Sequence, residues 1–150
     1  MRPIQKVLPT LGRLLMGLVF TVFGLNFFFH FIPMPPPTPR AAAFMGALAS
    51  GGYLLQLVHG VEVVMGVFLL TNRRVPLALT ILAPIIVNIV AFHIAVAPEG
   101  LPMAVVLLAL EVYLAWTYRT AFAAVVNSVA LPAVAPVARS GQVERPRKVA

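Results

Sequence analysis

The chain has 150 residues, of which 61% are hydrophobic and only 10% are charged. A soluble domain carries about a quarter charged residues, so this composition excludes an ordinary soluble domain and indicates a protein that faces a lipid bilayer. The formal net charge is +7, but the basic residues lie at the ends of apolar segments, so we expect no nucleic-acid binding. Cysteine is absent, which excludes disulfides, cysteine-ligated metals and thiol relays through this chain.

Four apolar segments are long enough to cross a hydrocarbon core as helices, which takes about 20 residues. They cover residues 8–31, 53–70, 76–96 and 102–122. Proline or paired glycine stands at each start, and proline, arginine or glycine follows the first three, as expected where helices begin and end. The sequence therefore predicts an all-α integral membrane four-helix bundle over residues 1–122. Gly17, Gly24, Gly60 and Gly66 are expected to permit close helix packing.

The connection between the first two spans, residues 32–52, is long and rich in proline. Its prolines predict an extended entry. Residues 41–50 then predict a short helix that lies in the outer membrane interface or folds back over the mouth of the bundle. At the other end of the chain, residues 123–150 predict a basic, flexible tail close to anionic headgroups.

Orientation is indicated by the basic residues. Ten of the eleven Lys and Arg residues fall on one side of this topology, Arg13 among those that flank the first span, and only Arg40 falls on the other. The positive-inside rule then predicts a multi-pass membrane protein with both termini in the cytoplasm. The first apolar segment is too long for a signal peptide, so we expect it to be retained.

Polar side chains within the spans are the candidate site, because each is costly in lipid unless it is paired or faces a cavity. They are Asn26, His30, Gln56, His59, Glu62, Asn88, His93 and Glu111. With a rise of about 1.5 Å per residue, all of them fall at mid-depth or in the outer half of the membrane, although the helices alternate in direction. This agreement predicts one polar pocket that opens outward.

Two interpretations of these residues stay open. The amides Asn26, Gln56 and Asn88 are typical of interhelical hydrogen bonding. The ionisable His59, Glu62 and Glu111 instead favour a functional pocket that binds a ligand or passes protons, and His30 and His93 fit either role. Their spacing matches no metal motif, so no metal site is predicted.

Four stretches carry a family resemblance. They are Gly24-Leu25-Asn26 with the phenylalanine-rich end of the first span, His59-Gly60-Val61-Glu62-Val63, Ala83-Pro84-Ile85-Ile86-Val87-Asn88 within residues 77–93, and the leucine-rich fourth span with Glu111. Over residues 13–122 the chain thereby resembles the DoxX family of small four-span bacterial membrane proteins. That resemblance implies association with membrane redox complexes, because the family takes its name from a subunit associated with thiosulfate:quinone oxidoreductase.

Two functions follow as hypotheses. The first is an accessory or quinone-interacting subunit of a membrane redox complex, with quinone as cofactor and other redox subunits as partners. The alternative is a noncatalytic scaffold that stabilises another protein, which the lack of a nucleophile motif, phosphate-binding loop or cysteine favours. A carrier of small molecules or metal is a third, with little room for alternating access in one four-helix chain. The residues leave open whether the chain is an enzyme.

Overall fold

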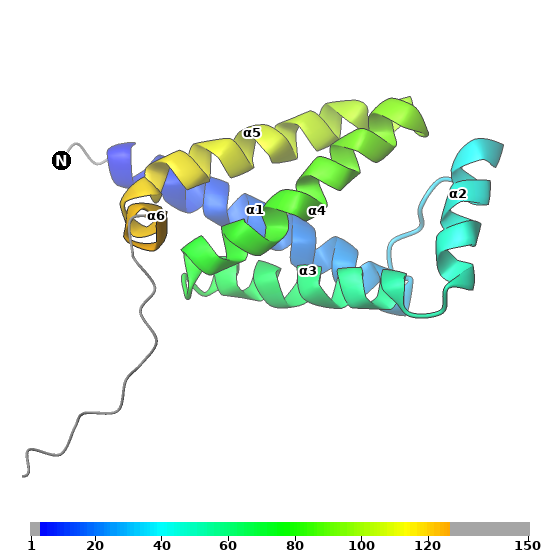
Figure 1. Cartoon of the computed structure of the whole chain (residues 1–150), viewed down its shortest axis with the longest axis horizontal. Coiled ribbons are helices and arrows are strands. Elements are labelled where there is room, and N and C mark those ends of the chain that lie inside the picture. Colours follow the sequence, from blue (N-terminus) through cyan, green and yellow to red (C-terminus); the bar gives the residue numbers. More distant parts are fainter. Residues whose placement is uncertain (1–3, 127–150) are drawn as a thin grey trace, which may run out of the picture.

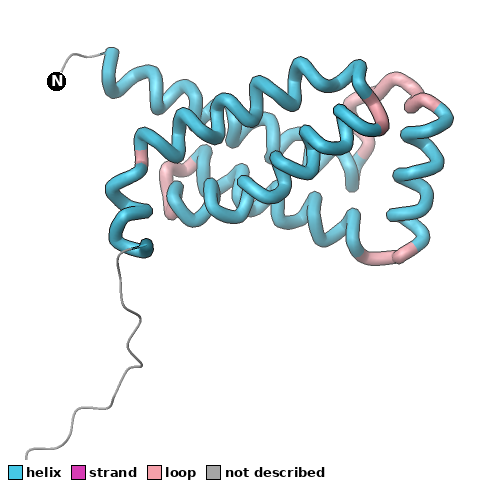
Figure 2. The backbone as a smooth tube through the Cα atoms, turned by 45° about the horizontal axis from the view of Figure 1, so that its top comes forward, coloured by secondary structure: helices cyan, strands magenta, loops and turns pink. Residues whose placement is uncertain are grey.

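The four predicted spans and the predicted short helix all form helices in the computed structural model, which describes residues 4–126 (Figures 1 and 2). The elements are α1 (Ile4–Phe29), α2 (Pro39–Ser50), α3 (Leu54–Leu70), α4 (Val75–Ala95), a 3-10 turn η1 (Pro98–Gly100), α5 (Leu101–Thr117) and α6 (Arg119–Val126). No strand occurs within residues 4–126. The predicted basic tail lies outside the described residues from residue 127 onward.

The main helices pack in a ring: α1 lies along α3, α3 against α4, α4 against α5, and α5 against α1. Helices α3 and α5 are therefore diagonal to each other. The inward faces of the helices form one apolar core, which includes Met16, Phe20, Leu69, Leu82, Ile86, Leu107 and Leu114. This arrangement is the expected one for helices with one apolar stripe each turned toward a common centre.

The α1–α3 contact is the closest in the bundle. A Cβ atom on Gly66 would lie 2.5 Å from Thr21 Oγ1 and 2.9 Å from the Gly17 carbonyl oxygen, and one on Gly24 would lie 2.8 Å from Val63 Cγ2. The prediction that Gly17, Gly24 and Gly66 allow close packing is confirmed. For Gly60 it is wrong, because a Cβ there would meet nothing within 4 Å among the described atoms.

Three helical segments are long and apolar enough to cross a membrane: Val7–Phe29, Val75–Ala95 and Pro98–Thr117. A fourth is added if the pair α2 and α3, bent by 94°, counts as one span. Large apolar side chains such as Leu11, Phe29 and Val112 are exposed on the surface of the bundle. An apolar surface of this extent is typical of contact with lipid, so the chain has the form of a multi-pass membrane protein.

Helix α2 lies across one end of the bundle, which we call the α2 end (Figure 1). Thr38 caps this helix, since its Oγ1 accepts a hydrogen bond from Ala41 N at 3.3 Å. The turn into α3 uses Gly52, whose φ of +79° suits glycine. The ring centroids of Phe44 in α2 and Phe92 in α4 are 5.5 Å apart, and α2 also contacts α3. These contacts agree with the predicted position of α2 over the mouth of the bundle.

The helix bounds differ from the bounds of the predicted spans at both ends of the fold. Helix α1 begins at Ile4 and ends at Phe29, because His30 adopts a left-handed φ of 52°. Helix α5 ends at Thr117 rather than at residue 122, and α6 turns away from it (Figure 1). At this break Tyr118 has φ −94° and ψ 13°, and the Arg119 guanidinium donates to the Trp116 carbonyl oxygen at 3.1 Å and lies 5.2 Å from the centroid of the Trp116 ring.

Candidate functional site

The core of the candidate site is a hydrogen-bonded pair on the inward face of α3. Glu62 is buried in the same stripe as Met65 and Leu69. His59 lies one turn nearer the α2 end, and residues three apart share a helix face. His59 Nδ1 lies 2.7 Å from Glu62 Oε2, and the two side chains are 23% and 7% exposed. The pair therefore combines a protected carboxyl group with an imidazole that a ligand can still reach.

Helix α1 fixes the orientation of this imidazole. The Phe27 ring stacks on the His59 ring, with 4.2 Å between centroids and 25° between planes. A Cβ on Gly24 would lie 3.0 Å from the His59 carbonyl oxygen, so α1 approaches this turn closely. With one ring face covered and Nδ1 engaged by Glu62, the remaining polar atom is Nε2, which has no hydrogen-bond partner among the described residues.

Glu111 is the second buried carboxyl group. It is 6% exposed, and its Oε2 has no hydrogen-bond partner within the described part of the chain. Its part of α5 packs on the start of α1, since a Cβ on Gly12 would lie 3.5 Å from Leu110 Cδ2. A buried carboxyl oxygen without a partner is costly in a protein interior, which makes Glu111 a candidate for ligand or proton chemistry.

Glu62 and Glu111 are both buried within the bundle, but they come from diagonal helices. The turn of α3 beside Glu62 faces α1 at Gly24, and the turn of α5 beside Glu111 faces α1 at Gly12; these two positions are about 18 Å apart along the α1 axis. Between the two carboxyl groups no hydrogen bond or ion pair occurs in residues 4–126. The interior thus holds two acidic positions rather than a touching carboxyl pair.

The structure assigns two other predicted site residues to turns. Asn26 Oδ1 accepts a hydrogen bond from Ile32 N at 2.6 Å, and Asn26 Nδ2 donates to Ile32 O at 3.2 Å. Asn26 therefore closes the turn after α1 instead of bridging two helices. His93 Nδ1 lies 2.8 Å from Ala97 O, and its ring occupies the space where a side chain on Gly100 would stand. Both residues stabilise local chain reversals at the α2 end.

Three predicted residues lie on the surface. His30, Gln56 and Asn88 are all exposed, and none of them has a side-chain hydrogen bond to another described residue. Their depth in the membrane was predicted from chain position, which carries no information about the direction in which each side chain points. Of the eight predicted residues, the structure joins only His59 and Glu62 directly.

Arg13 is a buried residue whose role the sequence analysis missed. It was counted among the charges that flank the first span, but it is only 7% exposed and lies inside α1. Its guanidinium donates to the carbonyl oxygens of Leu69 and Leu70, the latter at 3.2 Å. The last carbonyls of a helix lack intrahelical donors and carry the negative end of its dipole, so Arg13 caps α3. The available signal was that Arg13 stands within an apolar run.

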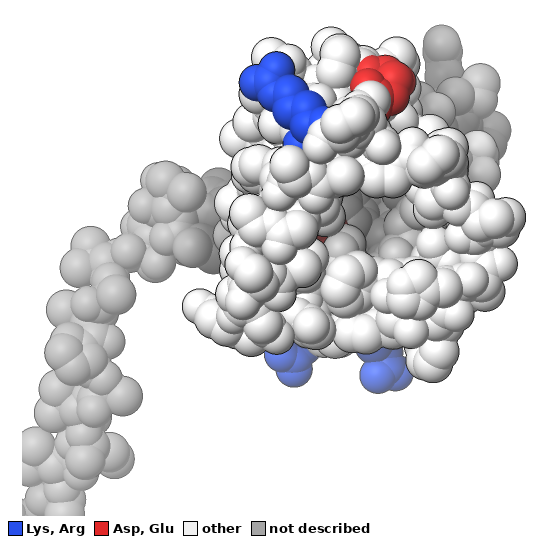
Figure 3. Space-filling view, turned by 90° about the vertical axis from the view of Figure 1, so that its right-hand side faces the viewer, with Lys and Arg blue, Asp and Glu red and all other residues white. Residues whose placement is uncertain are grey.

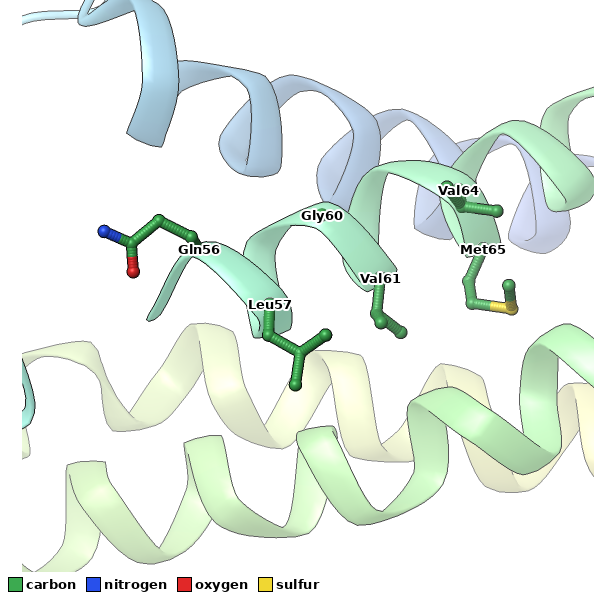
Figure 4. A pocket seen from close by; sticks show the side chains of 6 residues that line it. All are labelled: Gln56, Leu57, Gly60, Val61, Val64 and Met65. Carbon is green, nitrogen blue, oxygen red and sulfur yellow. The ribbon is translucent and has the colours of Figure 1, made fainter. Parts of the chain in front are cut away.

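Figure 3 looks onto the α2 end and shows this face hollowed between the helices, with the clearly visible Lys, Arg, Asp and Glu side chains at its edges. Apolar grooves mark the sides of the bundle. One of about 410 Å³ follows α3 around Gly60, which contributes no side chain (Figure 4); its lining is Gln56, Leu57, Gly60, Val61, Val64 and Met65. Another, of about 510 Å³, lies between α1 and α5 beside Gly12 and Leu110.

Residues 4–126 contain no group of three or more His, Cys, Asp or Glu side chains placed to hold a metal ion. Comparison of the chain with protein-family models, with curated proteins and with solved structures gives no match. The resemblance to the DoxX family therefore stays a prediction, and the function has to be argued from the geometry of the bundle.

Proposed function

We propose that the chain is a DoxX-like subunit of a membrane redox complex in the bacterial plasma membrane, and that the His59–Glu62 pair binds the headgroup of a quinone. The observation that carries this proposal is the pair itself: a 2.7 Å contact between a 7% exposed carboxyl group and a 23% exposed imidazole. Intramembrane ionisable residues that are paired and face the bundle interior are typical of proton or ligand sites.

The proposed orientation places the α2 end at the periplasmic surface. Arg73, Arg74 and Arg119 lie at the opposite end of the bundle, and the α2 end holds only Arg40 and Glu99 among the charged residues of the described chain. An excess of positive charge marks the cytoplasmic side. Both termini are then cytoplasmic, α2 lies at the outer interface, and the quinone headgroup enters from the outer half of the membrane.

The chemistry follows from the two ring nitrogens of His59. Glu62 accepts a hydrogen bond from Nδ1, and Nε2 of the protonated ring can donate to a carbonyl oxygen of the quinone. Reduction of a bound quinone would consume two electrons from the redox partner and two protons; His59 would be placed to hold one of these protons at Nε2, and the other would come from water at the outer surface. Glu62 holds the ring in position through this 2.7 Å contact.

The apolar part of a quinone also has a place on α3. The groove around Gly60 starts at Gln56, which is one helical turn from His59. A groove of about 410 Å³ in which four of the six lining residues contribute apolar side chains fits hydrocarbon. The proposed ligand thus lays its tail along the lipid side of α3 and turns its headgroup inward to His59.

The proposal is tested by calorimetry, which measures the affinity of a short-tailed quinone analogue for the protein purified in mild detergent. We expect Glu62→Gln to weaken binding by roughly tenfold or more, because a charge-assisted hydrogen bond contributes about 1.5–3 kcal/mol. Glu99→Gln makes the same chemical change at an exposed residue and should leave the affinity unchanged. Equal affinities for both variants, or no binding by the unaltered protein, would overturn the proposal. Absence of binding together with a co-purifying partner protein would favour the scaffold function.

A further inference from the structure

Asn88 presents an amide to the surface of α4 at membrane depth. Helix α4 spans Val75–Ala95, so Asn88 lies about 10 Å from one end of the helix and about 20 Å from the other. Its side chain is too short to reach the headgroups from there. The amide has two N–H donors and one carbonyl acceptor, and an unsatisfied polar group in hydrocarbon is strongly unfavourable. Asn88 therefore requires a partner that residues 4–126 do not supply.

The surface around Asn88 suits a second helix. An exposed stripe follows the same side of α4 at spacings of three and four residues; we define this α4 stripe as Thr80, Pro84, Asn88, Ala91 and Ala95. All but the amide are small or compact side chains, which let another backbone approach closely. The core of this chain uses the other side of α4, where Ala78, Leu82 and Ile86 are buried. All five residues of the stripe are thus exposed in the described chain.

We propose that the α4 stripe packs against the α4 stripe of a second copy of this chain, with the two Asn88 amides hydrogen-bonded to each other. Two copies inserted in the same orientation bring their α4 helices together in parallel, with both Asn88 residues at one depth. Across a two-fold axis along the membrane normal, each Nδ2 donates to the other Oδ1, so the amide is its own complement. Lipid tails have no such group at this depth. The inference goes beyond the proposed quinone site and does not depend on it.

The absence of cysteine makes this interface directly testable by oxidative cross-linking in native membranes. Ala91→Cys places a thiol on the α4 stripe beside Asn88 and is expected to give a disulfide-linked dimer. Val112→Cys is the matched control, because Val112 is exposed to 61% on α5, away from the stripe, and should give little dimer. Adding Asn88→Leu to Ala91→Cys should lower the dimer yield at least about threefold, the size expected for one interhelical hydrogen bond in a membrane, whereas Asn88→Gln keeps an amide and should retain part of it.

Three results would overturn the proposal: equal dimer yields from Ala91→Cys and Val112→Cys, a yield that Asn88→Leu leaves unchanged, or cross-linking of Ala91→Cys to a different protein. Asn88 is exposed and outside the core, so Asn88→Leu is expected to fold. An unchanged thermal unfolding midpoint of that variant, measured in detergent at monomer concentrations, confirms that lost cross-linking reports the interface and not the fold. Quinone binding by Asn88→Leu should remain intact.

Discussion

Arg13 of α1 donates a hydrogen bond to the carbonyl oxygen of Leu69 at the end of α3. This contact lies at one end of the same α1–α3 interface in which Phe27 covers His59. A buried guanidinium that caps a neighbouring helix fixes the two helices in register along their axes. The position of the His59–Glu62 pair relative to α1 therefore depends on a residue far from it in the bundle.

Replacement of this cap is expected to destabilise the whole bundle. Arg13→Met removes the side-chain donor to the Leu70 carbonyl oxygen and one donor to the Leu69 carbonyl oxygen, which keeps Asn72 N at 3.2 Å. It should lower the free energy of unfolding by about 1–3 kcal/mol. Arg73→Met, which removes an exposed arginine, should change it by less than about 0.5 kcal/mol. Unfolding of both variants by denaturing detergent in mixed micelles measures the difference. Equal stabilities would show that the cap contributes nothing.

Removal of the His59 side chain should destabilise the protein mainly because Glu62 loses its hydrogen-bond partner. His59→Ala leaves a buried carboxyl group without its hydrogen-bond partner, at an expected cost of about 1–3 kcal/mol. Gln56→Ala truncates an exposed side chain on the same helix and is expected to be nearly neutral. The same unfolding assay compares them, and Glu62→Gln should be milder than His59→Ala because the amide oxygen still accepts from Nδ1. A neutral His59→Ala would contradict the assigned pairing.

The glycines of α3 offer a pair of variants that differ only in their surroundings. Gly66→Ala puts a methyl group 2.8 Å from the Thr21 backbone nitrogen, so α1 and α3 must separate, at about 1–3 kcal/mol. Gly60→Ala adds the same methyl group where nothing lies within 4 Å and should gain up to about 1 kcal/mol from helix propensity. Thermal unfolding midpoints in detergent should therefore move in opposite directions. A shift in the same direction for both would argue against the close α1–α3 approach.

The helices could be predicted from the sequence because hydropathy and the length of each apolar run decide them. The end of α5 could not, since Arg119 had to be weighed against the apolar residues that follow it. Nor could the capping role of Arg13, which depends on where α3 ends in space. The Arg13 contact joins residues 56 positions apart in the chain, whereas the end of α5 depends on a local balance around Arg119.

The part of the candidate site that lies within one helix could be predicted from the sequence. His59 and Glu62 stand three residues apart on one helix, so their pairing follows from helix geometry alone. By contrast, the outward direction of Asn88 depends on which side of α4 enters the core, and the separation of Glu62 from Glu111 depends on the order in which the four helices pack. The position of a residue along a helix can be predicted from the sequence, whereas the side of the helix that faces a neighbouring helix is known only from the folded structure.

The proposed quinone site is tested most directly by chemical modification of His59 with diethyl pyrocarbonate, mapped by peptide mass spectrometry. The Nε2 atom of His59 has no partner among the described residues, so the reagent should label it in the ligand-free protein, and a short-tailed quinone analogue should suppress that labelling. His30 is exposed and serves as the internal control, with equal labelling in both samples. Labelling of His59 that the analogue leaves unchanged would contradict binding at this pair.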